Sequence, residues 1–319
     1  MLSSGNVEVE VEVEVEGILQ RAFPGALVQN WEPLFGGVSA RAISVELVLP
    51  TGDRRRIVVR RPSCPTIEER RRVARSEYRL LALCKSANIP VPTPCFLGEK
   101  EAALVLEYIE GTVDFAPRDS SSLLRQMAEH LARIHQVCTG ADCDFDCDFL
   151  PRLSDSLAHS LAEPPEELDV ALDEPYLRSV LCELWPWPCN RDRLLHGDYW
   201  PGNILWRDQR LAAVIDWEEA TLGDPLADVA ITRLDLWWAF GESAMHTFTE
   251  YYRECSSIEL DWSQLAAWDL AVALRPMSNL ARWATAYQKP PIARSDITYD
   301  SMRETHRRFT LQALAKLGA

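Results

Sequence analysis

The chain has 319 residues, which is long for one domain and sufficient for two. Hydrophobic residues make up 47% of it, as expected for a globular protein with a sizeable core. Its formal net charge is −15, from 48 acidic and 33 basic residues, which argues against binding nucleic acid or an anionic membrane through bulk charge. A cationic small-molecule partner is compatible with this charge.

Nine cysteines are scattered along the chain in no pattern that indicates disulfides or a zinc site. The tightest group, Cys138, Cys143 and Cys147, contains no C-x-x-C pair and has no histidine placed to complete a tetrahedral site. No signal-peptide pattern precedes them, so reduced thiols and a cytoplasmic location are predicted. No apolar run approaches the roughly 20 residues that span a bilayer.

The first third of the chain has mainly the pattern of β-strands. Residues 7–16 read VEVEVEVEVE, which has strand period but a like charge at every second position, and predict an edge strand or a frayed extension without chemistry. Residues 43–49 and 56–60 are β-rich runs joined by the turn sequence Pro-Thr-Gly-Asp. Residues 66–86 read as a helix, and residues 104–106 read as a further buried strand.

The remainder of the chain has the pattern of helices. Residues 124–134 carry an apolar stripe at helical spacing, and residues 225–240, 262–287 and 300–317 carry similar patterns. Such a change from strand period to helical period predicts an α+β protein. We expect three segments: a β-rich lobe over 1–106, a hinge over 107–112 and a helical lobe over 113–319.

The strongest chemical signal lies in residues 194–203, which read LLHGDYWPGN. Asp198, followed five positions later by Asn203, has the spacing of the kinase catalytic loop H-R-D-x-x-x-x-N. In that loop the aspartate accepts the proton of an attacking hydroxyl and the asparagine holds magnesium. A polar turn in which Asp198 serves as a cap is the alternative interpretation.

The segment that follows favours the catalytic interpretation. Residues 204–206 and 211–215 are apolar runs on either side of a polar turn, which is the pattern of a β-hairpin. Because the start of the first strand lies beside the end of the second, the hairpin brings Asn203 and Asp216 together. An amide oxygen and a carboxylate at one point suit octahedral Mg²⁺. We therefore predict Asp198 as the catalytic base and Asn203 and Asp216 as metal ligands.

These motifs resemble those of the aminoglycoside phosphotransferase and choline kinase family. The matching sequences are HGD at 196–198, VIDWE at 214–218 and GDPLAD at 223–228. More narrowly, the chain is similar to the bacterial phosphotransferase enzyme family, and the resemblance covers residues from about 25 to 310. His196, Asp224 and Asp228 match family positions as well.

The resemblance implies a protein-kinase-like two-lobe fold, with a small antiparallel β-rich lobe and a larger, mainly helical lobe. It implies that ATP, with GTP as the alternative, binds with Mg²⁺ between the lobes. The implied reaction transfers the γ-phosphoryl group to a hydroxyl of a small molecule. We interpret His196 as a residue that organises the loop, Asp228 as a hydrogen-bond anchor beneath it, and His135 as a satisfied core histidine.

The first lobe offers residues for the nucleotide phosphates. Gly36, Gly37 and Ser39 stand where the family has its phosphate-covering loop, and glycine lets backbone N–H groups approach phosphate oxygens. A plain turn is the alternative. At the other end of the lobe, Glu107, Tyr108 and Ile109 fall at the lobe junction, where the resemblance implies that backbone groups bind adenine.

Arg60 ends a buried strand where kinases carry the phosphate-contacting lysine. Arginine keeps the positive charge, although its planar guanidinium differs from the point charge of lysine. Glu77 lies four residues from both Val73 and Leu81 on the predicted helix, so its carboxylate faces an apolar stripe and needs a partner. We predict an ion pair between Arg60 and Glu77, with a solvated strand end and a surface glutamate as the alternatives.

Tyr199, Trp200 and Glu218 adjoin the two catalytic segments and are the predicted acceptor-site residues. The rings could stack on a ligand and Glu218 could pair with an amine, or Trp200 and Glu218 could brace the loop instead. The motifs do not identify the acceptor, a role in antibiotic resistance or the oligomeric state. A catalytically idle nucleotide-binding protein and a protein kinase are alternative functions. Retention of both Asp198 and Asp216 disfavours the first, and DWE in place of DFG disfavours the second.

Overall fold

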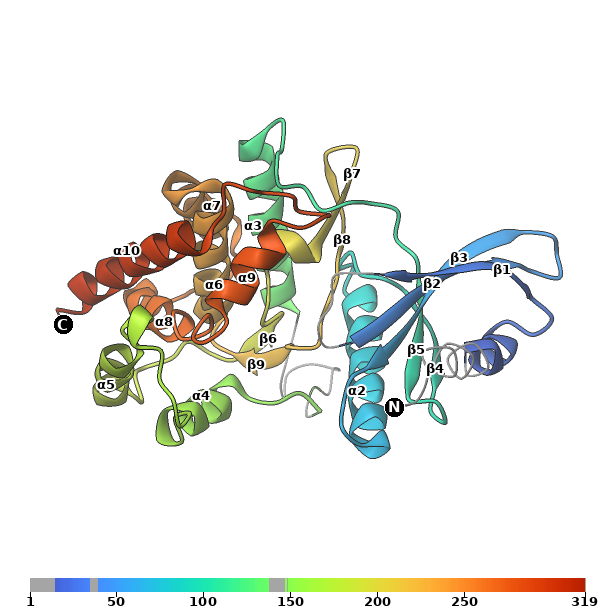
Figure 1. The fold of residues 1–319 in the computed structure, drawn as a ribbon, viewed down its shortest axis with the longest axis horizontal. Coiled ribbons are helices and arrows are strands. Elements are labelled where there is room, and N and C mark those ends of the chain that lie inside the picture. The colour runs from blue at the N-terminus through green and yellow to red at the C-terminus, as the bar shows by residue number, and fades with distance from the viewer. Residues whose placement is uncertain (1–14, 35–39, 138–146, 148, 319) are drawn as a thin grey trace. The chain divides into compact units, whose positions relative to one another are not determined.

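The structure is a computed structural model that describes residues 15–34, 40–137, 147 and 149–318. The chain forms two compact units, Met1–Glu110 and Gly111–Ala319, which we call the β unit and the helical unit (Figure 1). An antiparallel sheet in the first and helices in the second confirm the predicted α+β class. The division falls inside residues 107–112, and a hinge at this segment stays a prediction.

The β unit is built on one five-stranded antiparallel sheet with the order β1-β2-β3-β5-β4. The two β-rich runs predicted to form a hairpin are strands β2 and β3, and Gly52 in their turn has a φ of 88° that glycine adopts without strain. The strands are β1 (Leu27–Leu34), β2 (Ala40–Val48), β3 (Arg54–Pro62), β4 (Pro94–Gly98) and β5 (Ala103–Glu107).

The segment that follows the valine–glutamate repeat is helical. Residues 15–22 form a helix, so the expectation of a strand or frayed extension is wrong for Val15 and Glu16. Ile18 and Leu19 are buried against the sheet, and burying one apolar face is enough to favour a helix over a strand that exposes half its side chains. Residues 7–14 of the repeat lie outside the described residues.

Helix α2 (Ile67–Ser86) matches the helix predicted at 66–86 and contacts strands β3, β4 and β5 (Figure 1). Its start is fixed by a capping box: Thr66 Oγ1 accepts a hydrogen bond from the Glu69 N–H, and the Glu69 carboxylate accepts one from the Thr66 N–H. This cap satisfies two backbone donors that would otherwise lack partners. It sets the register that turns Glu77 inward.

The helical unit contains most of the helices and two small antiparallel sheets, β6 with β9 and β7 with β8. Its strands are β6 (Arg193–Leu195), β7 (Ile204–Arg207), β8 (Arg210–Val214) and β9 (Thr221–Gly223). Its α-helices are α3 (Ser120–Gln136), α4 (Leu153–Ala162), α5 (Glu174–Leu184), α6 (Pro225–Phe240), α7 (Glu242–Cys255), α8 (Leu265–Val272), α9 (Leu280–Tyr287) and α10 (Tyr299–Leu317).

Helix α6 is the central element of this unit, since every residue from Pro225 to Ala239 is buried and the helix contacts α7, α8 and α10. Within this packing, Arg233 donates to both carboxylate oxygens of Asp269 on α8, at 2.9 and 3.0 Å, and to Thr249 on α7. The bidentate geometry offsets the cost of burying the two charges. It joins α6 to α8 in the core.

Residues 262–287, which carry a helical pattern, form two α-helices and not one continuous helix. A short 3-10 turn leads into α8, the chain then forms turns over residues 273–279, and α9 begins at Leu280. Pro276 has no N–H to continue a helix, and Ser278 has a φ of 59° in the left-handed region. The break between α8 and α9 places Arg275 outside a helix.

No helix among the described residues is long and apolar enough to cross a bilayer.

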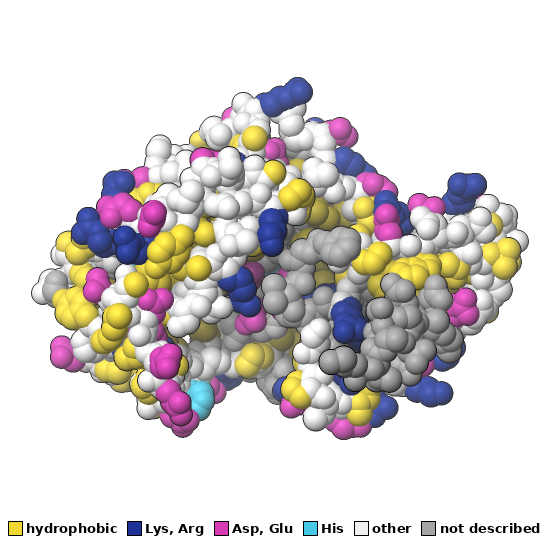
Figure 2. Space-filling view, viewed as in Figure 1, with side chains coloured by type: hydrophobic (Ala, Val, Ile, Leu, Met, Phe, Trp, Pro, Cys, Tyr) yellow, Lys and Arg dark blue, Asp and Glu magenta, His cyan; other side chains and the backbone are white. Residues whose placement is uncertain are grey.

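On the face drawn in Figure 2, acidic and basic side chains are intermixed instead of gathered by sign. The described side chains on that face therefore form no extended basic surface for a phosphate backbone.

We expect Thr66→Ala to lower the free energy of unfolding of the β unit by about 1 kcal/mol, because the substitution removes the side-chain half of the capping box. Urea denaturation followed by circular dichroism measures the change. Ser76→Ala, inside the same helix, is the matched control and should not destabilise. Equal stability of the two variants would contradict a role for the cap.

Candidate active site

The loop that carries Asp198 begins where β6 ends. Strand β6 pairs with β9, which brings residues 195 and 221 together. Gly197 follows with a φ of 80°, and a Cβ at this position would lie 2.0 Å from the carbonyl oxygen of Glu219. No side chain fits at that distance, so only glycine allows the loop to pass so close to the segment after β8. Steric crowding therefore requires glycine at this position of the HGD motif.

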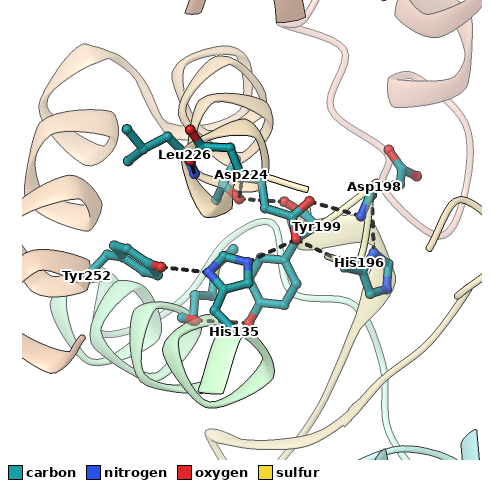
Figure 3. A network of polar contacts seen from close by, with 11 residues as sticks. His135, His196, Asp198, Tyr199, Asp224, Leu226 and Tyr252 are labelled. Carbon is teal, nitrogen blue, oxygen red and sulfur yellow. Dashed lines mark hydrogen bonds and ion pairs between the residues drawn. The ribbon is translucent and has the colours of Figure 1, made fainter. Parts of the chain in front are cut away.

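A buried carboxylate holds the loop from below. Oδ2 of Asp228 accepts a hydrogen bond from the His196 N–H at 2.7 Å, and Oδ1 accepts one from the Gly197 N–H at 2.9 Å. Nε2 of His135 lies 3.2 Å from Oδ2 (Figure 3). Asp228 is fully buried on α6, which confirms its interpretation as an anchor beneath the loop.

Burial alone would raise the pKa of Asp228, but hydrogen bonding and charge from His135 and the contacts with His196 outweigh it and lower the pKa. The carboxylate is thus ionised and able to accept from all three donors. His135 in turn contacts the Tyr252 hydroxyl through Nδ1 at 2.6 Å (Figure 3). Both ring nitrogens of His135 have partners, as predicted for a core histidine.

His196 links the two catalytic segments. Its Nε2 lies 3.0 Å from the carbonyl oxygen of Ile215, and its Nδ1 lies 3.2 Å from the backbone N–H of Asp198. Burial lowers the pKa of His196, which favours the neutral ring. A neutral ring with the proton on Nε2 donates to Ile215 and accepts from Asp198. This geometry confirms His196 as an organiser of the loop.

Asn203 holds the carboxylate of Asp198. Its side-chain nitrogen donates to Oδ2 and to the backbone carbonyl of Asp198, both at 2.9 Å. The amide nitrogen is committed to Asp198, and among the described residues Oδ1 of Asn203 has no hydrogen-bond donor. Since that oxygen is the end of the amide suited to a metal, the donor set fits the predicted role.

Asp216 lies beside Asn203, as the hairpin predicted. β7 and β8 pair with Ile204 opposite Val214, and the Ile215 N–H donates to the carbonyl of Asn203 at 2.9 Å. Asp216 has a φ of 63°, in the left-handed region that costs a non-glycine residue free energy and that is concentrated at functional sites. An amide oxygen and a carboxylate are hard ligands that suit Mg²⁺, which usually completes its shell with water and phosphate oxygens.

In the β unit, Arg60 and Glu77 form the predicted ion pair, with Nη1 of Arg60 contacting Oε2 of Glu77. Both residues are buried, at 9% and 6% exposure. Arg60 comes from β3 and Glu77 from α2, so strand and helix jointly position the guanidinium. The alternatives of a solvated strand end and a surface glutamate are excluded.

The predicted phosphate loop, with Gly36, Gly37 and Ser39, lies outside the described residues, as do Cys138 and Cys143. At the end of β5, the N–H groups of Glu107 and Tyr108 donate to Thr93 and Arg56, so these two donors are already engaged. Among the described residues, the backbone of Ile109 makes no such bond. A role of this segment in adenine binding stays a prediction.

The three predicted acceptor-site residues differ in their surroundings in the structure. Tyr199 is fully buried and its hydroxyl donates to the carbonyl of Met127 at 2.9 Å, so its assignment to the acceptor wall is wrong. Trp200 packs over Gly202, where a Cβ would come within 2.3 Å of the indole, and its ring lies 5.7 Å from that of Tyr287. Glu218 lines a cavity of the helical unit.

This cavity has a volume of about 380 Å³ and reaches the catalytic loop at Gly197. Aliphatic side chains from α4, α6 and α8 form much of its wall, and charged groups lie among them. Its principal apolar lining residues are Leu153, Leu157, Leu195, Ile231, Val272 and Leu274, and its charged lining residues are Arg178, Glu218, Glu219, Asp228 and Arg275.

Sequence reasoning missed Arg275 and Asp235. Nη2 of Arg275 contacts Oδ1 of Asp198, and Nη1 lies 3.7 Å from Oδ2 of Asp235 on α6. Asp235 occupies an apolar stretch of α6, where a lone carboxylate indicates an unseen partner. The sequence does not indicate which cation contacts these two carboxylates, because Arg275 lies as many as 77 positions after Asp198.

The antiparallel sheet, the contact of Asn203 with Asp198 and the buried pair of Arg60 and Glu77 match the arrangement that the sequence predicted for a kinase-like fold. The chain belongs to the phosphotransferase enzyme family (APH), whose model matches residues 30–268.

Curated relatives are much longer proteins. The chain is 26% identical over 203 residues to acyl-CoA dehydrogenase family member 10 of Mus musculus, which covers 57% of this chain and 18% of the relative. It is 26% identical over 255 residues to acyl-CoA dehydrogenase family member 11 of Gallus gallus, covering 70% and 31%. The chain spans less than a third of the length of these relatives.

Solved structures share the fold across nearly the whole chain. A macrolide 2'-phosphotransferase type I has a TM-score of 0.61 at 18% identity, covering 97% of both chains. A thermostable mutant of aminoglycoside phosphotransferase APH(4)-Ia, in ternary complex with ADP and hygromycin B, has a TM-score of 0.57 at 20% identity, covering 96% of this chain and 97% of that one. At this identity the likeness shows the fold alone.

We expect Asp228→Asn to destabilise the helical unit by about 2–3 kcal/mol, because an amide has one accepting oxygen where the carboxylate uses two. Chemical denaturation measures the loss. Asp300→Asn, an exposed position on α10, is the control and should change stability little. If the two variants lose the same stability, Asp228 is not the anchor of the loop.

Proposed function

We propose that this protein transfers the γ-phosphoryl group of ATP to a hydroxyl of a small molecule in a magnesium-dependent reaction. The observation that carries the proposal is the placement of Asp198, Asn203 and Asp216 on two segments joined through His196. Phosphoryl transfer needs chiefly positioning of the reactants and neutralisation of charge. These residues supply the positioning, and Asn203 and Asp216 bind the metal ion that neutralises the charge.

In the proposed reaction the acceptor hydroxyl binds to the carboxylate of Asp198. As the new O–P bond forms, the bond between the γ-phosphorus and the bridging oxygen of ADP breaks, and the hydroxyl proton passes to Asp198. Asn203 and Asp216 would hold Mg²⁺, which neutralises phosphate charge when bound. The chain's own contribution is to fix Asp198 through Asn203 and through the backbone contact with His196.

Arg60 is proposed to contact the nucleotide phosphates, with Glu77 fixing its guanidinium. Gly36, Gly37 and Ser39 are proposed to cover the phosphates, and Ile109 to offer its backbone to the base. Two solved structures that share the fold contain ADP or AMP-PNP, which supports ATP as the donor. A third contains GDP, so GTP is the alternative donor.

The acceptor is proposed to occupy the 380 Å³ cavity of the helical unit, because that cavity adjoins Gly197 and Arg275 beside Asp198. Glu218 lines it and could pair with an amine of the acceptor. The aliphatic wall also suits an acceptor with an apolar segment. A panel of aminoglycosides, macrolides, choline-like amines, sugars and aliphatic hydroxy compounds, each with ATP and with or without Mg²⁺, tests the proposal through formation of ADP.

We expect Asp198→Asn to lower kcat by about 10²–10⁴-fold and to leave MgATP affinity nearly unchanged, because the carboxylate acts on the acceptor. Steady-state kinetics on an acceptor from the panel, with isothermal titration of MgATP, measures both quantities. Asp208→Asn in the turn of the same hairpin is the matched control and should retain full activity. Unchanged turnover in Asp198→Asn would refute the assignment of the base.

We expect Arg60→Gln to weaken MgATP binding by about tenfold or more, since one charge-assisted contact with a phosphate is lost. Arg60→Lys keeps the charge and should lose less. Arg61→Gln, the neighbouring position on β3, is the control. Equal affinity in all three variants would show that Arg60 serves only to neutralise Glu77.

A further inference from the structure

A guanidinium lies on the catalytic carboxylate. Nη2 of Arg275 contacts Oδ1 of Asp198, while Asn203 holds Oδ2. The side chains of Arg275 and Asp198 are 28% and 29% exposed, so the pair is within reach of a ligand and is not part of the core. Arg275 also lines the cavity proposed for the acceptor.

Asp235 faces Arg275 from the other side. Its Oδ2 lies 3.7 Å from Nη1 of Arg275, and the residue is 7% exposed on α6. Among the residues that the structure describes, Arg275 is the one cation within 4 Å of Asp235. Burial raises the pKa of Asp235 to about 7, with Arg275 opposing and Asp198 reinforcing the rise. A carboxylate buried in this way is costly unless it has a partner to hold.

We propose that Asp235 and Arg275 form a clamp that positions the carboxylate of Asp198 for the acceptor hydroxyl. The inference rests on the proposed role of Asp198. An ionised carboxylate has about four accepting positions, two on each oxygen. Arg275 takes one on Oδ1 and Asn203 takes one on Oδ2, so each oxygen keeps one position for the hydroxyl. The rotation of an aspartate carboxylate is otherwise broad, and holding both oxygens fixes its plane.

The clamp is not needed to join the helices that carry it. Arg233 and Asp269 already connect α6 to α8 through two hydrogen bonds in the core. Arg275 instead follows α8 in the break over residues 273–279, and this break directs it to the active site. The clamp costs the fold a break between α8 and α9 and the burial of the Asp235 carboxylate. Arg275 is therefore a positioning residue that an acceptor meets as it reaches Asp198.

The test compares Arg275→Gln, Arg275→Lys and Asp235→Asn with the wild-type protein. MgATP turnover is measured with water as the acceptor and with each acceptor that the panel identifies. We expect Arg275→Gln to lower kcat by about 10–100-fold with KM for MgATP unchanged, because a misoriented carboxylate affects the chemical step. Arg275→Lys should recover part of the loss, and Asp235→Asn should show a smaller loss in kcat than Arg275→Gln.

Asp269→Asn is the matched control, since it weakens the other ion pair between α6 and α8 without touching Asp198. It should lower the melting temperature and leave the kcat of the folded protein intact. If Arg275→Gln behaves like this control, with lost stability and normal kcat, the clamp is only a structural ion pair and the proposal fails.

Crystal structures of the wild-type protein and Arg275→Gln separate this proposal from the proposed function. We expect the Asp198 carboxylate to turn away from its wild-type orientation in the variant while the loop backbone keeps its course. An unchanged carboxylate overturns the clamp, whatever the kinetics. A wild-type protein that turns over no MgATP with any acceptor refutes the proposed function, and the carboxylate orientation still decides the clamp.

Discussion

The buried carboxylate of Asp228 is the constraint on which the catalytic geometry depends. A fully buried ion costs several kcal/mol unless its accepting positions are filled. Here they are filled by two backbone N–H groups of the catalytic loop and by His135 on α3. Any two of the loop, α3 and α6 alone leave the charge incompletely satisfied. Packing of the helical core and placement of the loop therefore stabilise each other.

His196 extends this constraint from the loop to the segment that carries Asp216. One ring nitrogen accepts from the backbone of Asp198, and the other donates to the carbonyl of Ile215, the residue before Asp216. Only a neutral ring can do both, and burial keeps it neutral by lowering its pKa. One rigid ring thus links the backbone at Asp198 to the backbone beside Asp216. The His196 side chain holds these two segments together without contacting a substrate.

The parts of the site that the sequence predicted are those encoded within short stretches of chain. The five-residue spacing of Asp198 and Asn203 and the alternation around the hairpin sufficed to bring Asn203 to Asp216. A carboxylate on an apolar helical stripe sufficed to pair Glu77 with a cation. These inferences combined the period of a helix or a strand and the cost of an unpaired charge with the spacing of kinase motifs.

The missed features depend on long-range packing. Adjacency to Asp198 suggested that Tyr199 faces a ligand, but its hydroxyl reaches back to Met127, 72 positions earlier. Arg275 was hidden by an apolar pattern that continues through residues 262–287 while the backbone breaks at 273–279. Periodicity reports which side chains are buried, and it does not report a turn that a proline and a left-handed serine impose between two buried segments.

The division between these two sets of residues bears on acceptor choice. Asp198, Asn203, His196 and Asp228 form one hydrogen-bonded assembly, to which the residue before Asp216 is joined through its backbone. Much of the cavity wall comes instead from α4, from the segment after β8 and from the end of α8, although Asp228 and Ile231 of α6 also line it. Substitutions at the other wall positions can therefore reshape the cavity without disturbing this assembly. Arg275, Gly197 and Asp228 are where the two sets meet, so a substitution at any of them alters both the cavity and the assembly.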